Sequence, residues 1–285
     1  MGRITEIYRY PVKSMGGESL AKTGLTPNGL PGDRAWAVRD EVRGGIRGAK
    51  KIPALMNCRA RYEKPPSESG SSTATITLPD GSRLSTSDAD VSERISDAID
   101  HPVSLWPLLP ADALDHYARG APDHADMEQE LRATFARTPD EPLPDLGKFP
   151  PEIFRYESPP GTYFDAYPLL ILSQQSLDEM SRRATGSRFD VRRFRPNFIV
   201  DLPDSDVPFP EATLEARNLR IGSAILEATI ACPRCVMTTH GFEDLPQDPA
   251  IMRALVANAG GNLGLYARIS EPGEVEVGDP FEIID

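Results

Sequence analysis

The chain has 285 residues, enough for one large domain or two small ones, and 39% of them are hydrophobic, as in ordinary proteins with a packed core. Its 43 acidic and 31 basic residues give a formal charge of -12, which repels polyanions and argues against nucleic acid as a partner. Three cysteines are too few for a disulfide scaffold, and the N-terminus lacks the apolar run of a signal peptide. The longest apolar stretch, residues 166–172, is far shorter than the roughly 20 residues that span a bilayer. We therefore expect a protein of the reducing cytoplasm without a membrane segment.

The N-terminal part is predicted to be mostly β. Residues 4–12 and 34–39 have the composition of strands. Residues 74–78 and 83–85 flank the turn sequence Pro79-Asp80-Gly81-Ser82, which predicts a tight hairpin. A helix follows, because Val91, Ile95, Ala98 and Ile99 recur at helical spacing behind Ser87 and Asp88, either of which could cap it.

The middle of the chain is rich in proline and in acidic residues. Several of the 28 prolines lie between Pro107 and Pro168, together with a concentration of acidic side chains. This composition predicts an insert or linker between two folded parts, with one helix around residues 127–135.

The C-terminal part is predicted to mix helices and strands. Ser176 and Glu179 form a capping box that predicts the start of a helix, which Gly186 would end. A second helix is expected near residues 248–257. Strands are expected at residues 197–202, 224–231, 266–269 and 274–277, and Ser270-Glu271-Pro272-Gly273 would be the turn between the last two.

Two cysteines lie directly after one of these strands, in the sequence Cys232-Pro233-Arg234-Cys235. In the strand, Leu226, Ala228, Ile230 and Cys232 share one face, and Pro233 cannot donate to a ladder, so pairing should end there. This pattern predicts a packed Cys232 and a reactive Cys235 in an exposed loop. A thiolate is a nucleophile and a soft-metal ligand, and the neighbouring Arg234 favours the ionised form.

Four interpretations of this cysteine pair remain open. Both cysteines could simply pack in the core. They could form a redox pair of thioredoxin type, although such pairs normally lie at a helix N-terminus and Val236, Thr238 and Thr239 favour extended chain. They could bind zinc with His240 and Cys58, although the close spacing of the pair is not repeated. In the fourth interpretation a single thiolate holds a transition metal whose other ligands come from an organic cofactor.

Four segments of the chain match a known set of motifs, in the same order: Tyr10-Pro11-Val12-Lys13-Ser14, Gly32-Asp33-Arg34-Ala35-Trp36, Arg193-Phe194-Arg195-Pro196-Asn197 and Cys232-Pro233-Arg234-Cys235. Weaker matches are Phe164-Asp165-Ala166-Tyr167-Pro168 and Gly278-Asp279-Pro280. With these motifs the chain resembles the MOSC superfamily, named for the C-terminal domain of molybdenum cofactor sulfurase. It is most similar to the two-part members, which include the mitochondrial amidoxime-reducing component and bacterial relatives.

The resemblance implies a mainly β fold with peripheral helices. The expected parts are an N-terminal β domain (residues 1–106), the acidic Pro-rich insert (residues 107–163) and a C-terminal MOSC β-barrel (residues 164–285). The cofactor is expected in the cleft between the two β parts, because its implied contacts come from both.

The resemblance also implies which residues form the site. Cys235 would be the catalytic residue and the metal ligand, binding molybdenum beside the dithiolene of a molybdopterin, while Cys232 has no such role. The residues implied to hold the pterin and its phosphate are Lys13, Ser14, Arg34, Tyr167, Arg195, Asn197, Arg234 and Tyr266. Arginine offers a planar fork of donors, lysine a compact charge, and asparagine both a donor and an acceptor, so these residue types fit an anion and a polar heterocycle.

The function implied by the resemblance is that of a molybdenum-dependent oxidoreductase, which reduces N-hydroxylated or N-oxide-type small molecules. A separate electron donor, a ferredoxin or a flavin reductase, is expected, because the chain has too few cysteines for an iron-sulfur cluster and no Gly-rich dinucleotide fingerprint. The alternative function is a carrier of the cofactor or of sulfur as a persulfide, without turnover.

The chain departs from its relatives at two places where substrate could enter. Gly48-Ala49-Lys50-Lys51 stands where the relatives commonly have a Thr-Ala-Arg stretch, and His240-Gly241-Phe242-Glu243-Asp244 stands where they often have an acidic turn of Asp, Pro and Gly. These departures leave the substrate less determined than the cofactor.

Overall fold

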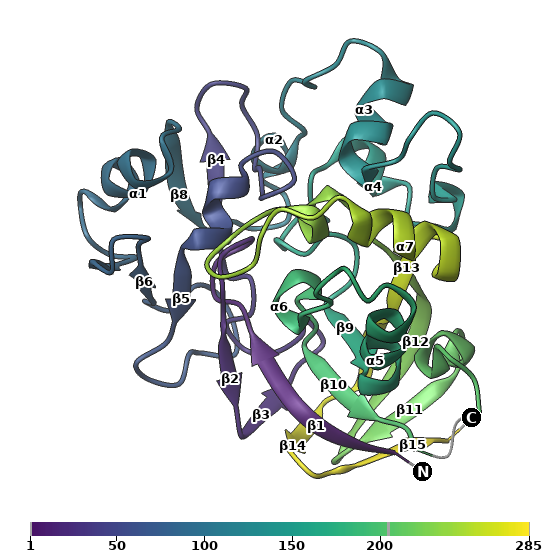
Figure 1. Cartoon of the computed structure of the whole chain (residues 1–285). Coiled ribbons are helices and arrows are strands. Elements are labelled where there is room, and N and C mark those ends of the chain that lie inside the picture. The colour runs from purple at the N-terminus through teal and green to yellow at the C-terminus, as the bar shows by residue number, and fades with distance from the viewer. Residues whose placement is uncertain (1, 204–205, 285) are drawn as a thin grey trace.

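The computed structural model describes residues 2–203 and 206–284, and its largest feature is a β-barrel. The strands follow the order β10-β9-β13-β12-β11-β15-β1, and pairing of β1 with β10 closes the ring. Figure 1 shows the barrel in the lower part of the molecule, with helices α5 and α7 on its outer side. The barrel strands are β1 (Gly2–Arg9), β9 (Leu169–Ser173), β10 (Phe198–Asp201), β11 (Asn218–Ile221), β12 (Ala224–Pro233), β13 (Asn262–Glu271) and β15 (Pro280–Ile283). The mainly β fold with peripheral helices is thus confirmed.

The barrel is filled by apolar side chains that alternate along its strands. Ile4 and Ile7 of β1 pack there with Leu226 of β12 and with Phe198 of β10. Along β12 the predicted buried face holds except at Ile230, which is only half-buried. The cause is a shift of register between Ala228 and Ala231, since a bulge turns the side chains that it contains away from the regular alternation.

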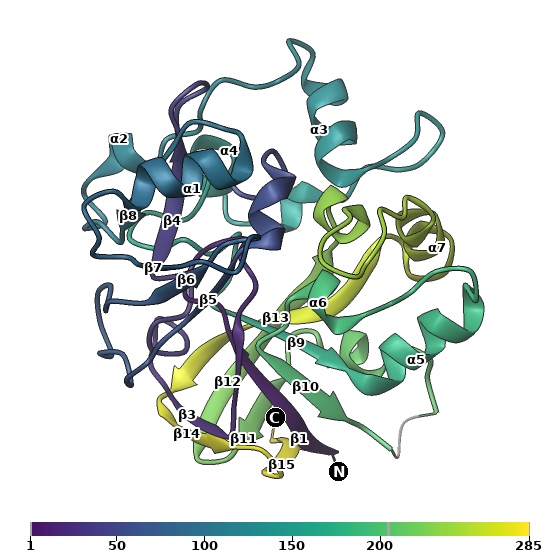
Figure 2. The ribbon, with the colours of Figure 1, turned by 60° about the vertical axis from the view of Figure 1, so that its left-hand side comes forward.

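A second group of strands lies beside the barrel, at the left in Figure 2. Its elements are β4 (Trp36–Asp40) paired with β8 (Val103–Pro107), the sheet of β5 (Arg59–Arg61), β6 (Thr75–Thr77) and β7 (Arg83–Ser85), the 3-10 helix η1 (Pro53–Asn57) and helix α1 (Val91–Ile99). The predicted hairpin and the predicted helix are both present. These elements share a hydrophobic core of their own.

Two short strands near the start of the chain nevertheless pair outside this group. Strand β2 (Glu18–Leu20) pairs with β1, and β3 (Lys22–Leu25) pairs with β14 (Gly273–Glu276). The predicted division at residues 106 and 163 stays a prediction.

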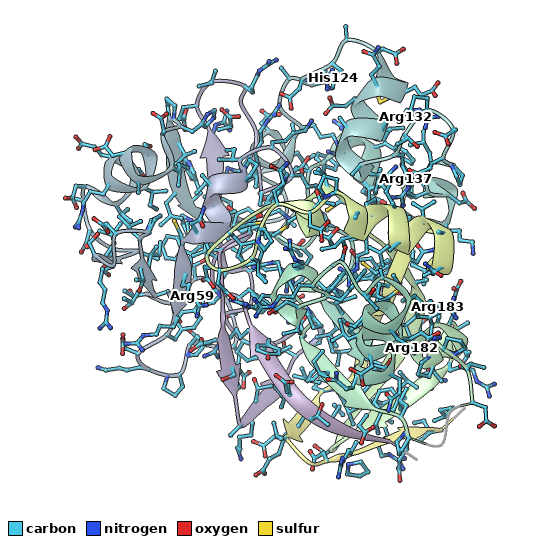
Figure 3. The ribbon with its side chains drawn as sticks, viewed as in Figure 1. Arg59, His124, Arg132, Arg137, Arg182 and Arg183 are labelled. Atoms are coloured by element: carbon cyan, nitrogen blue, oxygen red, sulfur yellow. The ribbon has the colours of Figure 1, made fainter. Side chains whose placement is uncertain are left out.

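The acidic insert contributes α2 (Leu114–Tyr117), α3 (Met127–Phe135), the 3-10 helix η2 (Leu146–Lys148) and α4 (Glu152–Arg155). Helix α3 has the predicted bounds. Figure 3 places Arg137 between α3 and α7 (Ala250–Ala259). There its guanidinium donates to the carbonyls of Phe135 at 2.9 Å and Gly261 at 3.4 Å. The insert is therefore fixed to the barrel side of the molecule.

Several local predictions were wrong. The N-cap of helix α5 (Gln174–Arg183) is three residues before the predicted one, since Ser173 caps the helix by accepting from the amide of Ser176, and the helix ends before Gly186. Neither Ser87 nor Asp88 caps α1, whose N-cap position is Asp90. Pro272 does join the two predicted strands, β13 and β14, but β14 pairs with β3, and a last strand, β15, was not predicted.

The remaining elements are short. They are α6 (Val191–Phe194), the 3-10 helix η3 (Pro210–Leu214) and the 3-10 helix η4 (Val236–Thr239). Across the described residues, the helices are all too short or too polar to cross a bilayer.

Candidate functional site

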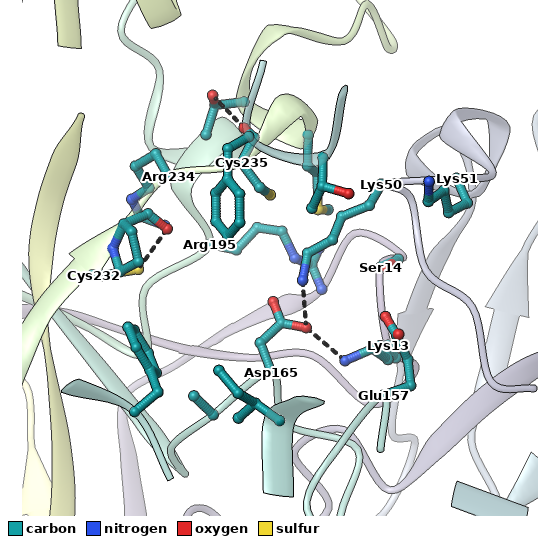
Figure 4. Close-up of a pocket in the computed structure, with 18 of the residues that line it drawn as sticks. Lys13, Ser14, Lys50, Lys51, Glu157, Asp165, Arg195, Cys232, Arg234 and Cys235 are labelled. Carbon is teal, nitrogen blue, oxygen red and sulfur yellow. Dashed lines mark hydrogen bonds and ion pairs between the residues drawn. The ribbon is translucent and has the colours of Figure 1, made fainter. Parts of the chain in front are cut away.

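A single cavity of about 450 Å³ is lined by every residue that the sequence nominated. Its wall is formed by the barrel, by the segment of residues 10–51 and by the insert, and Figure 4 shows its charged part. The nominated residues that line it are Lys13, Ser14, Arg34, Tyr167, Arg195, Asn197, Arg234, Cys235 and Tyr266, with Cys232 beside them. The structure thus brings the nine together, while the role of each stays a prediction.

Three of these residues have an unusual backbone conformation. Ser14, Arg34 and Arg195 have φ angles of 71°, 49° and 56°, in the left-handed region that residues with a side chain rarely adopt. Such positions persist only where the surrounding structure holds them, and they gather at functional sites. The Ser14 hydroxyl is held by the amide of Ala49 at 2.8 Å, and a side chain at Gly48 would collide with it.

Asp33 holds two cavity-lining residues, Arg34 and Asn197, although it was not among the predicted site residues. Its buried carboxylate accepts from the amide of Tyr10 at 2.7 Å and from the side-chain amide of Asn197 at 3.1 Å, and it pairs with Arg34. Asn197 also donates to the carbonyl of Tyr8 and accepts from the amide of Leu170. Both N–H groups of the Asn197 amide are therefore used within the protein, so that it positions its neighbours and keeps only acceptor capacity for a ligand.

Arg195 is buried and only partly satisfied. Its Nη1 donates to the carbonyl of Met15, and its guanidinium carbon lies 4.1 Å from the centre of the Tyr10 ring. Its Nη2 is buried with no hydrogen-bond partner. Burial lowers the pKa of Arg195 to about 10, because removal from water disfavours the charged form of the guanidinium. A buried donor of this kind is costly unless a ligand satisfies it.

Arg234, which directly follows β12, is also buried and only partly satisfied. Its Nε donates to the carbonyl of Leu263 at 2.7 Å and its Nη1 to that of Phe194 at 2.9 Å, while its Nη2 is buried without a partner. Gly264 faces that free nitrogen, and a Cβ there would lie 3.3 Å from it. Two cavity-lining guanidinium groups thus each retain an unused donor.

The two cysteines differ as predicted. Cys232 is buried at the end of β12, and burial raises its pKa, partly offset by Arg234 and by a hydrogen bond with Tyr266. Cys235 is half-buried just beyond the strand and lines the cavity. The expected extended chain after it was wrong, because Val236–Thr239 forms a 3-10 turn in which the Thr238 amide and hydroxyl donate to the Cys235 carbonyl.

Lys50 and Asp165 were missed as site residues. The Asp165 carboxylate lies 2.8 Å from Lys13 Nζ and 3.4 Å from Lys50 Nζ, between the two ammonium groups in Figure 4. Burial works to raise the pKa of Asp165, but the two lysines outweigh it and hold that pKa well below its usual range. The signals were available, since Lys50 lies in the segment that departs from the relatives and Asp165 lies in a weaker motif.

Two aromatic residues complete the wall. The rings of Tyr167 and Tyr266 lie 5.3 Å apart, and Phe149 of the insert lies 6.5 Å from Tyr266. Burial raises the pKa of Tyr266, so its hydroxyl keeps its proton and can donate. This corner offers flat surfaces beside Cys232.

The zinc interpretation is wrong for this fold. Within residues 2–203 and 206–284, no three His, Cys, Asp or Glu side chains lie together as a metal site would require. Cys58 is fully buried, and burial raises its pKa to about 11, so it stays a thiol. A metal in this cavity would therefore need ligands that the protein does not supply.

Two family models match the chain. The MOSC domain matches residues 159–282, and the MOSC N-terminal beta barrel domain matches residues 1–114. The chain thus carries the two domains of MOSC proteins. The two matched ranges contain all nine nominated site residues, whereas most of the insert, including α3, η2 and α4, lies in neither range.

Several relatives of this MOSC protein are mitochondrial amidoxime-reducing components, and two of them align with nearly all of the chain. Mitochondrial amidoxime reducing component 2 of Bos taurus is 24% identical over 310 aligned positions, covering 98% of this chain and 82% of that protein. Mitochondrial amidoxime-reducing component 1 of Mus musculus is 25% identical over 314 positions, covering 100% and 83%. The Homo sapiens component 2 is 30% identical over 131 positions, covering 41% and 37%.

Among solved structures, the YUAD protein of Bacillus subtilis aligns with 99% of this chain and 96% of its own, at a TM-score of 0.45 and 14% identity.

Proposed function

We propose that this MOSC protein is a molybdenum-cofactor-dependent reductase of N-hydroxylated small molecules. The observation that carries the proposal is the pair of buried, unpartnered donors, Arg195 Nη2 and Arg234 Nη2, on the wall that also holds Cys235. Unsatisfied buried donors are rare and costly, so their presence on a cavity wall points to an anionic or strongly accepting ligand. The names of the amidoxime-reducing relatives suggest the reaction.

The residues of the cavity fit such a cofactor. The cavity is lined by nine lysine and arginine side chains against three acidic ones, in a chain whose formal charge is -12. Lys13, Ser14, Arg34, Arg195 and Arg234 would hold the phosphate and the pterin, and the half-buried thiol of Cys235 would bind the metal. A single thiolate is a soft ligand that leaves the metal open on its other sides.

When bound, the cofactor would supply two-electron chemistry at the metal. The protein would contribute position and charge. Asp33 and Asn197 would fix Arg34, and Asp165 would moderate the charge of Lys13 and Lys50 and keep both ammonium groups directed into the cavity. Tyr266, held protonated by burial, would donate a hydrogen bond beside Cys232.

Electrons would come from a separate protein, a ferredoxin or a flavin reductase. A two-iron, two-sulfide centre needs four ligands, usually cysteines. The sequence has three cysteines, and they are all free thiols, as expected in a reducing compartment such as the cytoplasm.

The test uses protein produced in a host that makes the cofactor. With NADH or NADPH alone, we expect no reduction of benzamidoxime. With a reduced viologen dye, we expect benzamidine to form. Steady NADH oxidation by the lone protein would contradict the need for a donor. Full molybdenum occupancy without reduction by any donor would instead favour the carrier function, in which Cys235 holds the cofactor or a persulfide without turnover.

A further inference from the structure

Helix α3 of the insert has an apolar face with no core beneath it. Met127, Leu131 and Phe135 recur at helical spacing and all line the cavity, yet none of the nine residues of α3 is buried. The Met127 side chain is 69% exposed. An amphipathic helix normally buries this face against other apolar side chains, so here the face is turned toward an open space instead.

The other elements of the insert continue this apolar surface. Leu146 of η2, Phe149, and Ile153 and Phe154 of α4 line the same cavity, and Phe154 is 60% exposed. We define the apolar rim as Met127, Leu131, Phe135, Leu146, Phe149 and Phe154. Figure 1 shows α3 above the barrel.

The apolar rim belongs to the same cavity as the charged wall. The cavity wall contains both the basic side chains and the rim, and α3 lies beside the η4 turn that follows Cys235. The two sets meet at Lys51, which pairs with Glu130 of α3, and at Arg119, which donates to the carbonyl of Ile153 in α4. Neither matched family range includes the rim, so it is a feature of this chain's insert. A cavity lined by both charged and apolar side chains suits a ligand that has a polar group and an apolar group.

We infer that the apolar rim binds the non-polar substituent of the substrate, which is therefore an N-hydroxylated molecule bearing an aromatic or alkyl group. Of this substrate, only the N-hydroxyl group rests on the proposed function, and the apolar substituent rests on the rim. Burial of apolar surface is non-directional, so the rim would select for the size of the substituent while Cys235 and the basic wall lie near the polar group.

The experiment measures binding without turnover. Isothermal titration of the cofactor-loaded protein, with no electron donor, compares benzamidoxime with acetamidoxime, which share the N-hydroxyl group but differ in apolar area. The rim variants are Leu131→Asn and Phe154→Ser, neither of which lies in a hydrophobic core. The matched control is Val42→Ser, because Val42 is 62% exposed and lies outside the cavity.

We expect the wild-type protein to bind benzamidoxime at least about tenfold more tightly than acetamidoxime, as burial of a phenyl ring predicts. The preference should fall to about two- or threefold in the rim variants and stay unchanged in Val42→Ser. Equal binding of the two amidoximes by the wild type, or an undiminished preference in both rim variants, would overturn the inference.

A turnover assay separates this inference from the proposed function. If the wild type reduces neither amidoxime but shows the rim-dependent binding preference, the proposed reaction fails and the rim inference stands. If both amidoximes are reduced and the rim variants alter only the KM for a protein electron donor, the rim is a docking surface for that donor and the inference is wrong.

Discussion

Arg193 and Arg195 lie two positions apart and line the same cavity, yet they do opposite things. Arg193 is 1% exposed, and its guanidinium donates to the carbonyls of Thr238 at 3.1 Å, His240 at 2.8 Å and Pro246 at 2.6 Å. It therefore holds the loop after Cys235 in place. Arg195 keeps an unused nitrogen. Both residues are arginines, so the difference between a structural role for Arg193 and a ligand-binding role for Arg195 comes from the carbonyl groups around each. The sequence nominated Arg195 by resemblance and could not show what Arg193 contacts.

We predict that Arg195→Met and Arg193→Met will separate stability from cofactor binding. In cofactor-free protein Arg195→Met should change the free energy of unfolding by less than about 1 kcal/mol, because it removes a poorly satisfied buried charge. Retention of pterin after dialysis should fall by roughly one to two orders of magnitude. Arg193→Met should cost about 3 kcal/mol or more, since several buried carbonyls lose their donor. Denaturant unfolding and pterin extraction measure both. Equal destabilisation with unchanged pterin retention would contradict the assignment of Arg195.

Elements with a strong local pattern were predictable, and elements defined by their partners were not. The helical spacing of apolar residues located α1, and the Pro-Asp-Gly turn located the β6–β7 hairpin. Strand β9 was missed because all five of its residues are buried, so that it shows no alternation to separate it from a helix. The start of α5 was misplaced because Ser173, rather than Ser176, accepts the capping hydrogen bond.

The start of α5 is also joined to η3 by a buried carboxyl group, which gives a pH prediction. Glu211 is 1% exposed, and the hydroxyls of Ser173 and Ser176 lie 2.5 and 2.6 Å from its Oε2. Burial raises the pKa of Glu211. The folded protein therefore holds this proton more tightly than the unfolded chain does. The stability that the proton contributes is lost as pH rises from about 4.3, the pKa in the unfolded chain, through the raised pKa of the folded protein.

Glu211→Gln should remove that loss. Relative to the wild type, the variant should become more stable as pH rises from 4.5 to 8, as urea unfolding at each pH would measure. A stability difference that does not change with pH, or one that moves in the opposite direction, would show that Glu211 is charged in the folded protein.

At the scale of the molecule, the site depends on pairing between the first strand and strands of the C-terminal part of the chain. Strand β1 closes the barrel against β10, and the loop after it carries Lys13 and Ser14 to the cavity. Arg195 fastens this loop by donating to the carbonyl of Met15. Motif order along the chain predicted that the nominated residues would meet, because each motif belonged to a shared resemblance. The motifs did not single out Asp33, Lys50 and Asp165, although each lies in a quoted segment, because their roles come from contacts between distant segments.

The most direct test of the whole account is the molybdenum and pterin content of three proteins made in a cofactor-producing host: the wild type, Cys235→Ala and Cys232→Ala. The wild type should carry close to one molybdenum per chain. Cys235→Ala should lose the metal, because the half-buried thiol in the cavity is its proposed ligand, whereas Cys232→Ala should keep much of it, because that side chain is packed at the strand end. Circular dichroism would establish that both variants are folded. Equal loss of molybdenum from two folded variants, or a wild type that carries neither molybdenum nor pterin, would contradict the account.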